Sequence, residues 1–186
     1  MKNSNRLNLA QEYVRNAHSH IVGTSISGIK KPQIHHIQEV ADLVWISGGT
    51  EDEIISAWLH DSVEDTEVSF DNIEEIFGKE VRDIVYGLTD HGHYKDLPLQ
   101  ERKQLQADRL KNESTSVRRI KIADQTSNIR GLTIDPINSM TEEECYYYIR
   151  GAKLLADECK GVSELLDNIF DQEYIKGLER FPNILR

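Results

Sequence analysis

Ionisable side chains crowd one short stretch of the sequence, which reads HDSVEDT at residues 60–66. If this stretch is helical, positions 60, 61, 64 and 65 fall within an arc of about 140°, because each residue turns the helix by about 100°. Three carboxylates gathered beside one imidazole repel one another and are costly to bury. A bound divalent cation would neutralise them. A solvated acidic helix end with a capping histidine is the alternative.

Another carboxylate interrupts an apolar stripe far along the chain. Asp124 follows Val117 and Ile120 at helical spacing, so the pattern assigns it to the core. A buried carboxylate without a partner costs several kcal/mol or takes up a proton. Asp124 is therefore either a metal ligand or a hydrogen-bonded core residue paired with Arg82 or Arg118.

These two segments and an upstream histidine offer a mixed set of metal ligands, which comprises His36, His60, Asp61 and Asp124. Two imidazole nitrogens with two carboxylates suit Mn, Fe, Ni or Zn better than Ca or Mg. Glu64 and Asp65, one turn beyond the histidine, would remain for proton transfer.

The elements that must position these residues are predicted to be helices, because apolar residues recur at three- and four-residue intervals. Thr50 and Glu53 form a capping box that begins a helix running into residues 60 and 61, and Gly48 ends the helix before it. The predicted helices cover about residues 5–20, the span between Pro32 and Gly48, 51–61, 71–78 (or from 69), 79–88, 99–111, 117–129, 142–158 and 162–178. Residues 21–31 and 91–98 are predicted to be loops.

No alternating strand pattern, linker or internal repeat appears, so the sequence predicts one all-α domain over residues 1–186. Trp45 is placed on the apolar face of its helix. A solvated basic helix face is expected from Arg118, Arg119 and Lys121. Surface or loop-rim positions are expected for His18, His20, His91 and His93.

Composition excludes several classes of function. The chain has 22 Lys and Arg against 32 Asp and Glu, a net charge of −10, which opposes general nucleic-acid binding. Its apolar runs are far shorter than the ~20 residues that span a bilayer, and its first residues lack a secretory signal, so we expect a cytoplasmic protein without a membrane partner. Cys145 and Cys159 fall about 21 Å apart on one predicted helix, too far for a disulfide. The sequence does not determine the oligomeric state, and a homo-oligomer is one of the open alternatives.

The order of these residues resembles a known family. His36, then His60-Asp61, then Asp124 is similar to the H…HD…D signature of HD-domain metal-dependent phosphohydrolases. Residues 57–66, AWLHDSVEDT, resemble the LLHDTVEDT motif of the RelA/SpoT-homology small alarmone hydrolases. Later segments match in order, with FGKEV at 77–81, LTD at 88–90, LP at 97–98 and KIAD at 121–124. The resemblance covers about residues 10 to 160.

The resemblance implies an all-α HD-domain helical bundle of about eight to ten helices. It further implies a hydrolase-only enzyme that uses Mn²⁺ to remove 3′-pyrophosphate from guanosine tetraphosphate or pentaphosphate, a small phosphorylated nucleotide. The implied metal ligands are His36, His60, Asp61 and Asp124, and the implied proton-transfer pair is Glu64 and Asp65. The implied nucleotide contacts are Lys95 and Asn128, with Tyr147 as a neighbouring aromatic residue and Lys31 as part of a substitute basic pair.

Departures from the family pattern lie around the expected nucleotide rather than at the expected metal ligands. Gln33 and Ser127 replace tyrosines, Gln125 replaces a lysine, and Glu143 falls where an arginine is expected. Because a polyphosphate needs several donors, two other functions stay open. One is an HD phosphohydrolase or nucleotidase for another phosphorylated nucleotide, and the other is a catalytically silent HD module that binds a nucleotide or partner and regulates.

Overall fold

The computed structural model describes residues 5–24, 30–92, 96–136 and 140–182. Within these ranges lie ten α-helices and a hairpin of two short strands, β1 (Val22–Thr24) and β2 (Lys30–Pro32). The helices are α1 (Asn5–Ala17), α2 (Ile34–Ile46), α3 (Glu51–Leu59), α4 (Ser62–Asp65), α5 (Phe70–Phe77), α6 (Lys79–Leu88), α7 (Leu99–Leu110), α8 (Thr115–Ile134), α9 (Glu142–Cys159) and α10 (Glu164–Arg180). The predicted helical bundle is confirmed, with the hairpin added to it.

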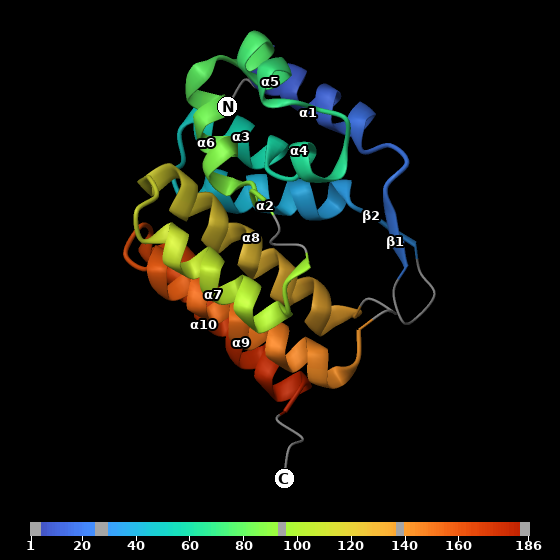
Figure 1. The fold of residues 1–186 in the computed structure, drawn as a ribbon, viewed down its shortest axis with the longest axis vertical. Coiled ribbons are helices and arrows are strands. Elements are labelled where there is room, and N and C mark those ends of the chain that lie inside the picture. The colour runs from blue at the N-terminus through green and yellow to red at the C-terminus, as the bar shows by residue number, and fades with distance from the viewer. Residues whose placement is uncertain (1–4, 25–29, 93–95, 137–139, 183–186) are drawn as a thin grey trace.

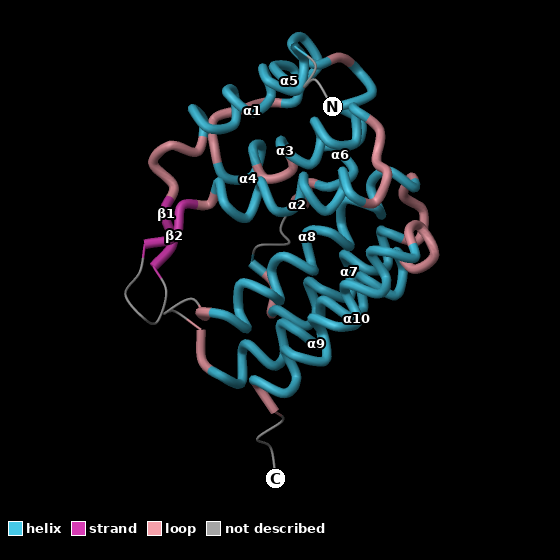
Figure 2. The backbone as a smooth tube through the Cα atoms, turned by 180° about the vertical axis from the view of Figure 1, so that it is seen from behind, coloured by secondary structure: helices cyan, strands magenta, loops and turns pink. Residues whose placement is uncertain are grey.

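Two groups of helices meet at α8. In Figure 1, α1 to α6 form the upper part of the molecule, and α7, α9 and α10 form the lower part. Helix α8 packs against α2, α3 and α6 of the first group and against α9 and α10 of the second, and α7 lies along α9. Figure 2 shows the same order from behind, with the hairpin at the edge of the molecule. Both groups therefore share one core through α8.

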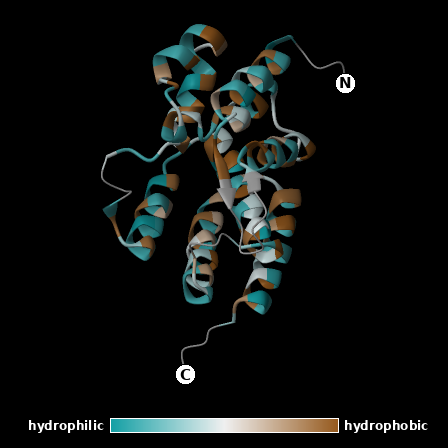
Figure 3. Ribbon diagram, turned by 90° about the vertical axis from the view of Figure 1, so that its right-hand side faces the viewer, coloured by the Kyte–Doolittle hydropathy of each residue, from teal (hydrophilic) through white to brown (hydrophobic). Residues whose placement is uncertain are grey.

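Apolar side chains from both groups fill that core. Ile37 of α2, Leu59 of α3, Ile120 of α8 and Leu155 of α9 are all fully buried. Figure 3 shows that most helices carry both hydrophobic and hydrophilic residues, as expected for elements with one buried side. Helical periodicity in the sequence thus identifies the faces that pack.

Local signals set several helix ends as predicted. Thr50 accepts a hydrogen bond from the Glu53 backbone, and the Glu53 carboxylate accepts one from the Thr50 backbone, so the capping box at the start of α3 is present. Gly48, with φ of 80°, follows α2 in the left-handed conformation that favours glycine. Gly78, with φ of 94°, separates α5 from α6.

Several predicted boundaries were wrong, beginning with α1, which ends at Ala17 rather than near residue 20. Helix α3 ends at Leu59, and a turn at residues 60 and 61 leads into the separate α4, so HDSVEDT is not one continuous helix. Helix α8 begins after the cap Ser114 and extends to Ile134, beyond the predicted 117–129. The segment predicted as a loop before α2 contains the antiparallel hairpin, in which Val22 pairs with Pro32.

Two further expectations concern disulfides and membranes. Cys145 and Cys159 are both buried and free, as expected from their spacing. Across the described ranges, no helix combines the length and the apolar character needed to cross a bilayer.

The expected position of Trp45 was wrong. Helical periodicity placed it on the apolar face of its helix, but its side chain is 47% exposed at the end of α2.

The cap at Thr50 should stabilise the helix that leads to His60. We expect Thr50→Ala to lower the free energy of unfolding by about 1 kcal/mol, because it removes the acceptor of the Glu53 backbone N–H. Urea unfolding followed by circular dichroism measures this change. The control is Thr115→Ala, an exposed first residue of α8 that is not its cap, for which a change within ~0.5 kcal/mol is expected. Equal stability of the Thr50 variant and the wild type would contradict the assignment.

Candidate metal centre

Three side chains from three different segments converge at the middle of the molecule. His36 lies in the first turn of α2, His60 directly follows α3, and Asp124 lies midway along α8. The Nε2 atom of His36 is 3.3 Å from Nε2 of His60 and 3.4 Å from Oδ1 of Asp124. One potential ligand atom from each residue lies within 4.8 Å of the other two. This spacing allows all three to contact one ion.

Hydrogen bonds at the far side of each imidazole fix which nitrogen faces the centre. The Nδ1 atom of His60 lies 2.8 Å from the carbonyl oxygen of Ala57, which can only accept. The Nδ1 atom of His36 lies 2.9 Å from Oγ of Ser127, whose own hydroxyl donates to Glu39. Both rings therefore carry their proton on Nδ1, which leaves the Nε2 lone pairs directed at Asp124.

Asp61 lies against the same two imidazoles. Its Oδ1 atom is 3.1 Å from Nε2 of His60, and its Oδ2 atom is 3.8 Å from Nε2 of His36. Gln33 donates a hydrogen bond of 3.0 Å to Oδ2 of Asp61 and one of 2.5 Å to Oδ2 of Asp65. Asp61 is thus beside the three-residue group without belonging to it, and Gln33 holds its position.

Asp124 is a charged carboxylate in the core. Lys121 donates to its Oδ2 at 3.1 Å, Gln125 donates to the same oxygen at 2.9 Å, and Asn128 donates to Oδ1 at 2.6 Å. Burial alone would raise its pKa, but the Lys121 ammonium, together with the hydrogen-bonding surroundings of the carboxylate, outweighs burial and holds the pKa of Asp124 well below its ordinary value. The site is therefore built around an ionised carboxylate.

The expected partners of Asp124 and the expected basic face were wrong. Arg82 pairs with Glu74 and Asp83 instead. Lys121 is largely buried at the centre, where the charges of Asp124, Asp90 and Glu64 overcome burial and raise its pKa. Arg119 is also mostly buried, and it pairs with Glu53 and the carbonyl of Ser47. Both side chains are therefore enclosed by other parts of the protein rather than solvated.

The two carboxylates of the expected proton-transfer pair have different surroundings. Glu64 is partly buried, and its Oε1 accepts a 2.9 Å hydrogen bond from the backbone N–H of Asp90. Burial raises the pKa of Glu64, with the Asp90 N–H and the Lys121 charge acting against it. Asp65 is exposed and accepts from Gln33. Of the two, Glu64 has the environment that favours proton uptake.

A buried lysine beside the centre was missed by the sequence analysis. Lys103 of α7 donates to Oε1 of Gln125 at 2.8 Å, and its ammonium lies 4.3 Å from the ring centroid of Tyr148. Burial lowers the pKa of Lys103 to about 7. Burial, together with the charges of Asp124 and Asp61, raises the pKa of Tyr148. The signal that could have found it is the spacing of Lys103 with Ala107 and Leu110, which puts a charged residue on the buried face of α7, as for Asp124 on α8.

Of the four expected nucleotide contacts, the side chains of Asn128 and Tyr147 are described by the structure, and those of Lys95 and Lys31 are not. The side-chain amide of Asn128 is engaged by Asp124. Tyr147 packs edge-on against Tyr146, with ring centroids 5.4 Å apart, while the neighbouring Tyr148 is the tyrosine next to Lys103. Lys95 lies outside the described residues. Lys31 belongs to β2, but its side chain is outside the described part.

The remaining histidines divide between the surface and the core. His18 was expected at the surface and is buried, with Nδ1 at 3.1 Å from the carbonyl of Val14 and its pKa lowered chiefly by burial. His20 is exposed, as expected. His91 follows α6, and its ring centroid lies 4.2 Å from that of Tyr86. His93 lies outside the described residues.

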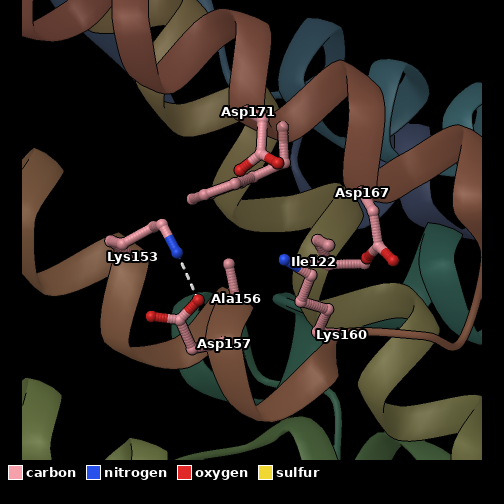
Figure 4. Close-up of a pocket in the computed structure, with 8 residues that line it drawn as sticks. Ile122, Lys153, Ala156, Asp157, Lys160, Asp167 and Asp171 are labelled. Atoms are coloured by element: carbon pink, nitrogen blue, oxygen red, sulfur yellow. Dashed lines mark hydrogen bonds and ion pairs between the residues drawn. The ribbon is translucent and has the colours of Figure 1, made fainter.

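A small pocket elsewhere is distinct from this centre. Figure 4 shows it between α9 and α10, where Lys153 pairs with Asp157. The pocket is lined by Ile122, Lys153, Ala156, Asp157, Lys160, Asp167, Phe170 and Asp171. None of the residues of the metal centre is among them, so this pocket is not part of the site.

The burial of Lys103 makes stability depend on pH. Its folded pKa of about 7 lies below the ordinary 10.5, so between these pH values the unfolded chain binds more protons and the folded state gains stability as pH rises. We expect the unfolding free energy of the wild type, minus that of Lys103→Met, to increase by more than ~1.4 kcal/mol from pH 7 to pH 9. Urea unfolding at both pH values measures it. A difference that is flat with pH would refute the neutral buried lysine.

Comparison with known proteins agrees with this architecture. Residues 10–145 match the HD domain family. The chain is 35% identical over 147 residues to the guanosine-3′,5′-bis(diphosphate) 3′-pyrophosphohydrolase MESH1 of Drosophila melanogaster, covering 76% of this chain and 80% of that protein. Identity to the Homo sapiens MESH1 is 32% over 147 residues, with the same coverage of 76% and 80%.

A solved structure gives the same result in three dimensions. It belongs to a metazoan ortholog of SpoT described as hydrolysing ppGpp, and it superimposes with a TM-score of 0.84 at 28% identity, over 94% of this chain and 97% of that one. The match includes both helix groups that meet at α8. The chain belongs to the HD domain family and, within it, to the family of the MESH1 guanosine-3′,5′-bis(diphosphate) 3′-pyrophosphohydrolases.

Proposed function

We propose that this protein is a metal-dependent hydrolase that removes the 3′-pyrophosphate of guanosine tetraphosphate or pentaphosphate, and that residues 1–186 act as a single HD phosphohydrolase domain. The observation that carries the proposal is the convergence of His36, His60 and Asp124 in a chain 35% identical to a MESH1 hydrolase. In this reaction a water oxygen bonds to the phosphorus next to the ribose 3′ oxygen, and the bond between that phosphorus and the 3′ oxygen breaks. Pyrophosphate leaves, and the 3′ oxygen takes up a proton.

The donor set fits a divalent transition metal. His36 and His60 direct Nε2 towards the position that the ionised Asp124 also faces, and we propose Asp61, which lies beside them, as a fourth ligand. Because two imidazoles and two carboxylates together suit a divalent transition metal, we propose that the ion is Mn²⁺. When bound, such an ion supplies positive charge that stabilises the attacked phosphate and favours ionisation of water.

The protein's own residues would then handle protons and phosphates. We propose that Glu64 accepts the proton of the attacking water, because its partial burial and raised pKa suit a group that takes up protons. Asp65, held by Gln33, is proposed as the second member of the pair. Lys31, Lys95, Asn128 and Tyr147 stay proposed as nucleotide contacts.

A second candidate substrate is another phosphorylated nucleotide. The family pattern has an arginine where this chain has Glu143, and the first turn of α9 carries two more glutamates, Glu142 and Glu144. The neutral Gln125 follows Asp124, with its side chain used by Lys103. Fewer cations than in the family pattern favour a substrate with fewer phosphates than guanosine tetraphosphate.

A substrate panel separates the two candidates. Purified protein with Mn²⁺ would be assayed against guanosine tetraphosphate, guanosine pentaphosphate, and nucleoside 3′- and 5′-phosphates. We expect the guanosine tetraphosphate to give pyrophosphate with the highest kcat/KM. A higher kcat/KM for another nucleotide would transfer the assignment to the second candidate, and no turnover of any compound would overturn both.

Loss of a ligand should remove both metal and activity. We expect His36→Ala and Asp124→Ala to bind no Mn²⁺ in metal analysis and to show no measurable turnover, because each removes one atom of the converging group. Circular dichroism would check that the variants fold. Full turnover by a folded variant without bound metal would rule out the proposed role of the centre.

Loss of the proton carrier should leave the metal in place. We expect Glu64→Gln to reduce kcat by about 10²- to 10⁴-fold while Mn²⁺ affinity is retained, because its carboxylate is outside the ligand group. The matched control is Glu67→Gln, an exposed glutamate in the next turn of the chain, which should keep wild-type kcat. Unchanged kcat in the Glu64 variant would contradict its role.

A further inference from the structure

Helix α8 provides more to the centre than Asp124. Ser127 lies three residues later, on the same face of the helix, and is almost fully buried. Its Oγ atom is 2.9 Å from Nδ1 of His36, the nitrogen that faces away from the metal position. One helix therefore contributes a ligand and also contacts the outer side of a second ligand.

The proton of the Ser127 hydroxyl has a defined acceptor. It is donated to Oε2 of Glu39 at 2.6 Å. A serine hydroxyl has one proton, so only its lone pairs face His36. His36 must then be the donor in this contact, which places its proton on Nδ1. Without Glu39, the hydroxyl could rotate and donate to Nδ1, and the tautomer would no longer be fixed.

The carboxylate of Glu39 is itself held in place. Arg130, one turn beyond Ser127 on α8, donates to Oε1 of Glu39 and, at 3.2 Å, to Oε1 of Glu173 on α10. Lys176 also donates to Glu173, at 3.1 Å. A hydrogen-bond network therefore joins α2, α8 and α10 through His36, Ser127, Glu39, Arg130 and Glu173. Because Arg130 binds Oε1 of Glu39, Oε2 accepts the hydrogen bond from Ser127.

We propose that Ser127, oriented by Glu39, is a positioning residue that holds His36 with its Nε2 lone pair aimed at the metal. The inference rests on the proposed function in that the centre binds a divalent ion. It adds a role for a residue outside the converging group of ligands. Hydrogen bonds to the outer nitrogen of a metal-bound histidine typically contribute 10- to 100-fold to metal affinity or activity.

Direct titration of the full-length protein with Mn²⁺ by calorimetry tests this inference. We expect Ser127→Ala to weaken Mn²⁺ binding by about 10-fold or more, with kcat/KM reduced and KM for the nucleotide nearly unchanged at saturating Mn²⁺. Ser127→Thr keeps the hydroxyl and should recover most of the affinity. Thr126→Val is the matched control, because Thr126 is buried on the same helix but donates only to the carbonyl of Ile122, and it should bind Mn²⁺ like the wild type.

A second variant tests the orienting carboxylate without changing the core of α8. Glu39→Ala removes a half-buried side chain and frees the Ser127 hydroxyl, so Mn²⁺ affinity should fall, by less than in Ser127→Ala. Equal Mn²⁺ affinity of the wild type, Ser127→Ala and Glu39→Ala would overturn the inference. An equal loss in Ser127→Ala and Thr126→Val would overturn it too, since the effect would then be general packing. The proposed function fails separately, if the wild type itself binds no Mn²⁺.

Discussion

Asp124 keeps an ionised carboxylate in the middle of a helical core, and the arrangement around it follows from the need to compensate that charge. An uncompensated buried carboxylate costs several kcal/mol. Here Lys121 supplies a cation, Gln125 and Asn128 supply N–H donors, and two imidazoles approach from the other side. Helix α8 can therefore pass through the centre of the molecule and still carry a charged residue on its buried face.

Helical spacing turns that single carboxylate into a complete set of supports. Lys121, Asp124, Ser127 and Asn128 recur at three- and four-residue intervals on α8, so they project to one side of it. The positions that depart from the family pattern are part of the same arrangement. Gln33 donates to Asp61, Gln125 donates to Asp124, and Ser127 accepts from His36. These replacements therefore take part in holding the proposed ligands.

Features set by neighbouring residues could be predicted from the sequence, whereas features set by distant parts of the chain could not. The caps at Thr50 and Gly78 and the span of α6 depend on neighbouring residues, and the sequence predicts them correctly. The burial of Lys121, Arg119 and His18 depends on helices that come from elsewhere in the chain, so charge and polarity alone placed them in solvent. The four proposed ligands could be named from their order and types. Their hydrogen-bond partners Ser127 and Gln33 could not, because hydroxyl and amide side chains serve equally well on a surface.

An acidic chain can bind the anionic substrate named for its relatives, because charges on the distant surface act only weakly at the site. A net charge of −10 acts over the whole surface, but at physiological salt its field is screened within roughly 8 Å. Inside the site, screening by solvent is weak, and Lys121 and Lys103 are largely buried cations beside the proposed metal ligands. Burial brings the pKa of Lys103 to about 7, whereas the charges of Asp124, Asp90 and Glu64 raise the pKa of Lys121. At neutral pH Lys121 therefore stays charged, while the charge of Lys103 depends on what lies beside it.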